Sequence, residues 1–351
     1  MAEAAVVTTS RLLKALRREP VDKAPVWFMR QAGRALPEYR AIRKEHTLLE
    51  ICRQPELCAD VTLQPIELLG VDAAIIFADI MTPLIGIGVD IDIVDGIGPV
   101  VGDPIRDHGG IESLGELEPE ADIPDVLDAL RLVKSRLQGK GGQALIGFSG
   151  APFTLASYLL EGRSSRDFHQ TKRMMYGSPV LWKQLMERLS EIVIIYLLAQ
   201  AEAGADVVQL FDSWAGALSP EDYARFVQPY SADILSAVES AGVPTIHFTT
   251  GTAGFLDLVR DAGGTTIGID WRVRLDEAWR GIGHNRGIQG NLDPMVLLGP
   301  VEEVRASAES ILAQAAGRSG HIFNLGHGVH PLTPVENLKA LVEVVHGYCP
   351  E

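Results

Sequence analysis

The sequence has few cysteines and more acidic than basic residues. Its 351 residues include three cysteines, Cys52, Cys58 and Cys349, and no two of them have C-x-x-C spacing. This odd number argues against a disulfide framework and a cysteine-rich zinc site, so we expect free thiols. The formal net charge of −15 argues against a non-specific nucleic-acid binder and against a protein held on anionic lipid. A cluster of arginines in such a chain indicates a local function.

Long apolar runs are also missing. The longest run, residues 192–199, is too short to span a bilayer, and residues 1–20 lack a basic segment followed by a long apolar core. The sequence therefore predicts a cytoplasmic protein. With 46% hydrophobic residues and no linker-like segment, we expect one domain over residues 1–351, with its core at about 12–348.

Standard cofactor motifs are missing as well. Gly86 and Gly88 are followed by Ile91, so G-x-G-x-x-G is not formed, and neither G-x-x-x-x-G-K-[ST] nor H-E-x-x-H occurs. The sequence GFSGA at residues 147–151 does not match the nucleophile elbow G-x-S-x-G. We therefore expect neither a cofactor nor a metal.

The sequence does contain short apolar runs that alternate with amphipathic stretches. Most of the runs are rich in β-branched or aromatic residues, as in strands of a parallel sheet that is buried on both faces. Residues 57–69, 126–137 and 301–316 are amphipathic, and a glycine follows each within two residues, which predicts helices. Eight βα units in series predict an α/β fold with a single (β/α)8 TIM barrel. The predicted strands are residues 25–29, 73–77, 144–148, 206–211, 244–248, 265–269, 287–290 and 321–325.

Residues 88–105 interrupt this alternation. Apolar and acidic residues alternate there with a period of two, and Asp95-Gly96 is a typical turn sequence. The pattern predicts a β-hairpin inserted after the second strand. Such an insertion often shapes the mouth of an active site or an oligomer contact.

In a TIM barrel, functional residues lie at the carboxyl ends of the strands. The residues at or beyond these ends are mostly polar and are our candidates. They are Arg30 and Arg34 after the first strand, Asp79 after the second, Tyr158 beyond the third, Asp212 and Ser213 after the fourth, His247 in the fifth, and His327 and His330 after the eighth.

Arg30 and Arg34 have two interpretations. They could pair with acidic residues on this acidic protein. Alternatively, two guanidinium groups on either side of Gly33 could grip a carboxylate or phosphate, because glycine lets the backbone approach a ligand closely. We favour an anionic substrate.

Asp79 and His327 also have a structural and a functional interpretation. Asp79 could cap the next helix, or it could be a carboxylate directed into a pocket that otherwise favours anions. His327 lies between Gly326 and Gly328, a loop setting that favours a ligand contact over a packed core histidine. Ser213, His247 and His330 are weaker candidates individually.

Five motifs are spread over almost the whole chain. They are RQAGRALPEYR at residues 30–40, FADIM at 77–81, GAPFTLASYLLEG at 150–162, FDSWAG at 211–216 and NLGHGV at 324–329. Together they resemble the uroporphyrinogen decarboxylase family. The resemblance implies a TIM barrel, usually a homodimer. It also implies an enzyme that removes CO₂ from the acetate side chains of uroporphyrinogen III to give coproporphyrinogen III, without metal or cofactor.

The resemblance also assigns site residues. It implies substrate binding by Arg30, Gln31, Ala32, Gly33, Arg34, Asp79, Tyr158, Ser213 and His327. Catalysis would proceed by protonation of a pyrrole, with the ionised Asp79 stabilising the resulting cation and Arg30 and Arg34 orienting the macrocycle. The candidate proton donors are an arginine, a bound water and a substrate carboxyl group.

Two other functions remain to be weighed. A cobamide-dependent methyltransferase of the same superfamily would bind zinc through an H-x-C pair, but residues 247–249 are His-Phe-Thr. A non-catalytic tetrapyrrole carrier could use the same arginines, but it would not need Asp79 at the centre of the macrocycle.

Overall fold

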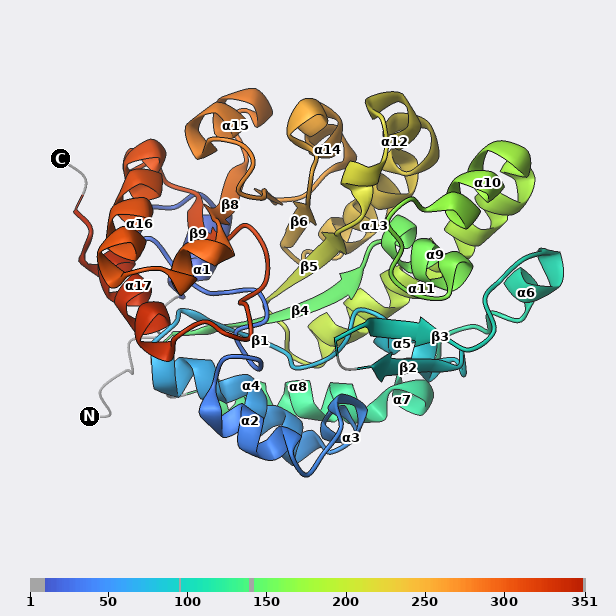
Figure 1. Ribbon diagram of the computed structural model, residues 1–351, viewed down its shortest axis with the longest axis horizontal. Coiled ribbons are helices and arrows are strands. Elements are labelled where there is room, and N and C mark those ends of the chain that lie inside the picture. Colours follow the sequence, from blue (N-terminus) through green and yellow to red (C-terminus); the bar gives the residue numbers. More distant parts are fainter. Residues whose placement is uncertain (1–9, 95, 139–141, 350–351) are drawn as a thin grey trace, which may run out of the picture.

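The centre of the molecule is a curled parallel β-sheet. The computed structural model describes residues 10–349 except 95 and 139–141. Within them the sheet has seven strands in the order β1-β4-β5-β6-β7-β8-β9, an α/β arrangement that resembles a TIM barrel (Figure 1). Each strand coincides with one of the predicted runs. The strands are β1 Ala73–Ile75, β4 Ala144–Gly150, β5 Val207–Asp212, β6 Thr245–Thr249, β7 Thr266–Gly268, β8 Gly287–Leu292 and β9 His321–Leu325.

Helices surround the sheet (Figure 1). Many begin with proline at the first turn, where its missing N–H has no partner to lose. The helices are α1 Arg11–Leu16, α2 Pro37–Arg43, α3 Leu48–Cys52, α4 Pro55–Leu69, α5 Thr82–Gly86, α6 His108–Glu112, α7 Pro119–Asp122, α8 Pro124–Leu137, α9 Pro152–Glu161, α10 His169–Gly177, α11 Pro179–Glu202, α12 Pro220–Phe226, α13 Gln228–Ser240, α14 Leu256–Ala262, α15 Leu275–Ile282, α16 Val301–Ala315 and α17 Val335–Gly347, with short 3₁₀ turns η1 Ala215–Ala217, η2 Ala253–Phe255 and η3 Pro294–Leu298. Within the described part of the chain, none is both long and apolar enough to cross a membrane.

The predicted helix ends are largely observed. Helix α4 ends at Gly70, which has the left-handed φ of 73° expected for a C-terminal glycine. In α16 the left-handed residue is Ala316, with a φ of 52°, and Gly317 follows it with a φ of 67°. The glycine expected to end α8, Gly139, lies outside the described residues.

Residues 25–29, the first predicted strand, do not form a regular strand. Only Val26 makes a parallel bridge, to Phe323 of β9. Side chains take up backbone N–H groups that a ladder would have used: Asp72 accepts from Val26 and Asn324 from Met29, at 2.8 and 3.2 Å. Backbone bonds also hold the segment: the Phe323 N–H donates to the Pro25 carbonyl at 2.8 Å, and the Asp72 N–H donates to the Val26 carbonyl at 2.8 Å. The segment therefore lies at the seam between β9 and β1 and is held there by backbone and side-chain hydrogen bonds together.

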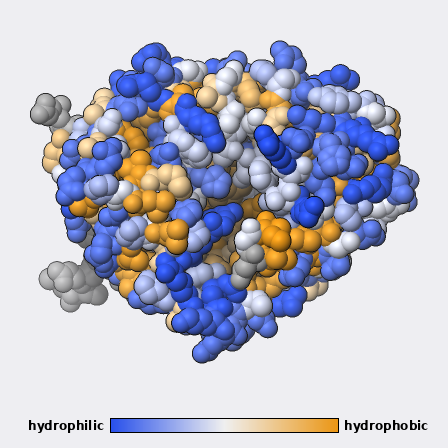
Figure 2. Space-filling model, viewed as in Figure 1, coloured by the Kyte–Doolittle hydropathy of each residue, from blue (hydrophilic) through white to orange (hydrophobic). Residues whose placement is uncertain are grey.

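A separate two-stranded antiparallel sheet lies between β1 and β4 in the chain. Its strands are β2 Ile91–Val94 and β3 Gly98–Val101, within the segment predicted as a hairpin. The backbone N–H of Val101 donates to the carbonyl of Gly162 at 2.8 Å, which fixes this sheet to the end of α9. The face of the molecule in Figure 2 is hollowed near its centre, and hydrophobic side chains gather beside the hollow over α5 and the β2–β3 sheet.

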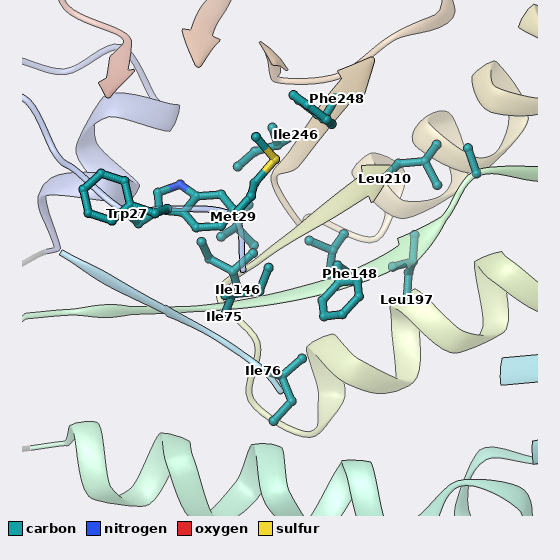
Figure 3. Close-up of a cluster of buried hydrophobic side chains, with 14 of the residues drawn as sticks. Trp27, Met29, Ile75, Ile76, Ile146, Phe148, Leu197, Leu210, Ile246 and Phe248 are labelled. Carbon is teal, nitrogen blue, oxygen red and sulfur yellow. The ribbon is translucent and has the colours of Figure 1, made fainter. Parts of the chain in front are cut away.

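The interior of the curled sheet is apolar with one polar chain through it. Figure 3 shows side chains from distant segments in one cluster, among them Trp27, Met29, Ile75, Ile146, Ile246 and Phe248. The Trp27 indole N–H donates to Gln289 at 3.0 Å, and Gln289 donates to Gln209 at 2.9 Å. These bonds satisfy buried polar groups and link the seam to β8 and β5.

Candidate active site

The connections that follow the strands pack against one another at the carboxyl edge of the sheet. A Cβ atom added at Gly326, after β9, would lie 2.5 Å from the Trp271 nitrogen, after β7. One added at Gly216, after β5, would lie 2.4 Å from the carbonyl oxygen of Thr250, after β6. Glycine is required at both positions because the backbones approach so closely. The candidate residues on these connections are thereby brought into one region.

Arg30 and Arg34 lie on a strained turn. Both have left-handed backbone conformations, with φ of 60° and 41°, and Gly33 between them has a φ of 126°. Such conformations are costly for arginine and persist only where the surroundings enforce them, often at functional sites. Both side chains are exposed, and neither forms an ion pair with any residue that the structure describes. The salt-bridge interpretation is therefore not supported, and both guanidinium groups are available to an anion.

Gln31 and Ala32 are buried residues of this turn. Gln31 is 1% exposed; its amide accepts from the Phe28 N–H at 2.9 Å and donates to the Ala73 carbonyl at 2.7 Å. Ala32 is also buried. The Gln31 side chain thus ties the arginine turn to the start of β1.

Asp79 is half-buried after β1 and has one bonded and one unbonded carboxylate oxygen. One carboxylate oxygen accepts from the Met81 N–H at 2.9 Å in the turn before α5, although α5 has no side-chain cap of its own. The other has no hydrogen-bond partner among the described residues. Burial raises the pKa of Asp79, although the Met81 hydrogen bond and the charge of Arg30 both lower it. Arg30 is close enough to act on the carboxylate electrostatically without forming an ion pair.

Tyr158 extends the site from α9. Its ring packs edge-on against Trp214, with ring centroids 5.9 Å apart. Burial and then the charge of Asp79 raise the pKa of Tyr158 to about 12, while Arg30 acts in the opposite direction. The phenol is therefore a neutral hydrogen-bond donor close to Asp79 and Arg30.

His327 is flanked by glycines that bring two other segments close. A Cβ atom at Gly328 would lie 2.6 Å from Cδ of Arg30, so the arginine side chain lies directly against this glycine. Desolvation and then the charges of Arg30 and Arg272 lower the pKa of His327 to about 4. The imidazole is consequently neutral at physiological pH and can donate or accept a hydrogen bond.

Ser213 and Asp212 end β5 and lie in different surroundings. Ser213 is half-buried, and its carbonyl accepts from the Thr250 hydroxyl at 2.7 Å. Asp212 is fully buried beside Thr154, and this burial raises its pKa to about 7. The Thr154 hydroxyl donates to Asp212 and accepts from the Trp214 N–H, both at 3.4 Å, so it links Asp212 to the turn that carries Ser213.

His247 and His330 do not join this group. His247 pairs in register with Leu210 and lies on the opposite face of β6 from Ile246, which points into the cluster of Figure 3. Burial lowers its pKa to about 4. His330 accepts from the Leu332 N–H at 3.2 Å within its own loop.

Sequence reasoning missed Arg272, on the connection after β7. Its guanidinium forms an ion pair with Asp270 and lies 4.1 Å from the centre of the Trp271 ring. The signal was available: the sequence Asp-Trp-Arg follows a predicted strand directly, as Arg30 follows the first predicted run.

Three kinds of comparison bear on this arrangement. The model of the family described as Uroporphyrinogen decarboxylase (URO-D) matches residues 8–348. A relative from Sorangium cellulosum named uroporphyrinogen decarboxylase is 54% identical over 96% of both chains, and one of the same name from Carboxydothermus hydrogenoformans is 50% identical over 95% of both. Among solved structures, a methyltransferase from Methanosarcina mazei is 26% identical with a TM-score of 0.80, covering 96% of this chain and 98% of its own.

Proposed function

Because the chain belongs to the uroporphyrinogen decarboxylase family, we propose that it is a carboxy-lyase that converts uroporphyrinogen III to coproporphyrinogen III by removing CO₂ from the acetate side chains. One structural observation supports this assignment at the level of individual residues. Arg30 and Arg34 have no ion-pair partner in the described chain, and Arg30 lies close enough to the half-buried carboxylate of Asp79 to lower its pKa. This combination suits a substrate with carboxylates at its rim and N–H groups at its centre.

The chemistry needs an electron sink, which the substrate provides. Protonation of the pyrrole ring at the carbon adjacent to the one that bears the acetate creates a delocalised cation. The C–C bond electrons then flow into the ring as CO₂ leaves. Protonation of the remaining exocyclic carbon and loss of a ring proton restore the pyrrole, which now carries a methyl group. The protein must bind, orient and stabilise charge, and needs no cofactor of its own.

Different side chains bind the substrate, orient it and stabilise the cation. The free oxygen of Asp79 accepts hydrogen bonds from the pyrrole N–H groups, and its ionised form stabilises the cation. Arg30 and Arg34 bind carboxylates bidentately and set the orientation of the ring. Tyr158, Ser213 and His327 supply neutral hydrogen bonds to further side chains of the substrate. Gly33, Gln31 and Ala32 form the turn that presents the two arginines.

The remaining proposals concern the protein as a whole. We propose a single domain over residues 1–351 that acts in the cytoplasm as a homodimer. Residues 25–29 serve as the first strand of the eight-membered barrel, because they occupy the seam between β9 and β1. The β2–β3 sheet is the insertion after the second strand of that barrel.

Incubation with uroporphyrinogen under anaerobic, reducing conditions tests the proposal. We expect CO₂ and successively less carboxylated porphyrinogens, separated by chromatography as their oxidised porphyrins. Binding without turnover would instead identify a tetrapyrrole carrier. If the protein neither binds nor converts uroporphyrinogen, the assignment is refuted.

The methyltransferase structure gives a second candidate, because it shares the fold and 26% of its sequence with this chain. A zinc-dependent member would need a ligand set, and the described residues contain no group of three or more His, Cys, Asp or Glu side chains arranged to hold a metal. Thr249 also occupies the position where the H-x-C pattern requires cysteine. We therefore favour the decarboxylase.

A further inference from the structure

Arg272 and Arg30 lie on the two segments that pack against the glycines on either side of His327. Gly326, which precedes His327, closes against the backbone of Trp271, and Gly328, which follows it, lies against the Arg30 side chain. The histidine is thus held between the arginine turn and the connection after β7. Both guanidinium groups act on its ring, since each lowers the pKa of His327.

The Arg272 guanidinium is held in place before any ligand arrives. It forms an ion pair with Asp270, whose side chain is 3% exposed, and it stacks on Trp271 at 4.1 Å from the ring centre. Its own side chain is nevertheless 52% exposed, so its other N–H groups face solvent. A cation fixed in this way loses little conformational entropy when it binds an anion.

Asp270 does not cancel the charge of Arg272, because backbone donors also share its carboxylate. One carboxylate oxygen accepts from the backbone N–H of Arg272 at 3.0 Å. The other accepts from the backbone N–H of Gly251 at 2.7 Å and from the Arg272 guanidinium. The effect of Arg272 on the pKa of His327 exceeds the opposing effect of Asp270. The site therefore has a net positive potential on this side of the imidazole.

We infer that Arg272 is a further substrate-binding residue, which holds a carboxylate at the rim of the macrocycle from the connection after β7. The inference rests on the proposed function for the identity of the ligand. A tetrapyrrole that carries acid side chains on every ring presents carboxylates in more than one direction. Arg30 and Arg34 bind carboxylates from the arginine turn, and Arg272 binds another from the connection after β7.

A binding titration tests this inference without depending on turnover. The probe is uroporphyrin, the stable oxidised macrocycle, followed by its fluorescence as the protein is added. Loss of a charge-assisted hydrogen bond predicts that Arg272→Gln raises the Kd by about tenfold. Arg274→Gln is the matched control, because Arg274 lies two residues on, is 57% exposed and pairs with Asp276 and Glu277. We expect it to change the Kd by less than about twofold.

Turnover of uroporphyrinogen supplies a second readout. A contact to a peripheral carboxylate is made equally in the ground and transition states, so Arg272→Gln should raise KM by about tenfold with kcat within about twofold. Arg272→Lys keeps the charge and should fall between wild type and Arg272→Gln. Circular dichroism checks that all three variants are folded.

The outcomes are distinguishable. Equal Kd values for wild type and Arg272→Gln, or equal losses for Arg272→Gln and Arg274→Gln, would overturn the inference while wild-type turnover still supports the decarboxylase. A lysine variant weaker than the glutamine variant would also overturn it, because the loss would then come from a disturbed loop. Wild-type protein that binds uroporphyrin through Arg272 but releases no CO₂ would refute the decarboxylase and leave the inference standing.

Discussion

Replacing Asp79 by asparagine separates the charge of this side chain from its shape. Asparagine retains a carbonyl oxygen for the Met81 N–H, which Asp79 accepts at 2.9 Å, so the turn before α5 should form normally. It can also accept from a pyrrole N–H, but it cannot stabilise a cation by charge. Removal of one preorganised electrostatic group typically costs about 2.7–4 kcal/mol of transition-state stabilisation, or about 10²–10³ in rate. We therefore expect kcat to fall by about 10² or more, with a smaller change in substrate Kd.

The same substitution should not destabilise the protein. Burial raises the pKa of Asp79 above its ordinary value of 3.8, so the folded protein binds this proton more tightly than the unfolded chain does. The ionised carboxylate therefore lowers stability, an effect that is absent at low pH and complete once the pH exceeds the folded pKa. Asp79→Asn removes that effect. Its Tm should equal or exceed that of wild type at pH 8, and the two values should converge in acid.

The assay combines kcat for CO₂ release, substrate Kd and thermal unfolding followed by circular dichroism. A wild-type kcat in Asp79→Asn would show that the side chain only supports the turn before α5 or docks the substrate. A loss confined to KM would mark uniform binding of substrate and transition state. A large fall in Tm at pH 8 would show that the charge is stabilised in the folded protein, contrary to the burial argument.

Four further predictions follow from the same geometry. Arg34→Lys keeps the charge but loses the bidentate fork, so kcat/KM should fall at least about tenfold; wild-type kinetics in the folded variant would contradict the carboxylate role. Gly328→Ala would put a Cβ atom 2.6 Å from Cδ of Arg30 and displace that side chain. We expect kcat/KM to fall by about tenfold with little change in Tm, whereas Gly281→Ala, where a Cβ atom meets nothing within 4 Å, should leave kinetics unchanged. Burial raises the pKa of Asp212 from 3.8 to about 7, so its ionisation lowers stability as the pH rises through that interval. Asp212→Asn should raise Tm at pH 8 but not at pH 4, and an equal or lower Tm at pH 8 would refute this account. Activity should survive exhaustive dialysis against EDTA, and a loss that added metal restores would refute the cofactor-free mechanism.

The sequence predicted the strands wherever burial determined them. Runs such as residues 144–148 are buried on both faces of the sheet, so their β-branched and aromatic residues identify them. Residues 25–29 have the same composition, but Asp72 and Asn324 bind their N–H groups. Those side chains lie far away in the sequence, and no local pattern could reveal that they interrupt the strand ladder, of which a single bridge from Val26 to Phe323 remains.

The candidate site was predictable to a similar extent, from polar residues at or beyond the strand ends. Arg30, Asp79, Tyr158 and His327 are linked electrostatically in the structure. His247 was predicted as a strand-end residue, but its side chain faces the helix layer. Successive side chains of a strand point to opposite faces, and the sequence alone does not determine which face His247 takes. Whether Arg30 forms an ion pair depends on its distance from carboxylates in the folded protein. The amino-acid composition carries no information about that distance.

The seam between β9 and β1 also affects when the site can form. The bond from Met29 to Asn324 joins residues 295 positions apart, and bringing such distant segments together carries a large loss of chain entropy. Arg30 and Arg34 lie just beyond one side of the seam, and His327 lies just beyond the other. During synthesis, the earlier βα units can fold as they emerge, but the arginines meet the histidine only after β9 has left the ribosome. Until then a growing chain carries most of the sheet and no complete site for the macrocycle.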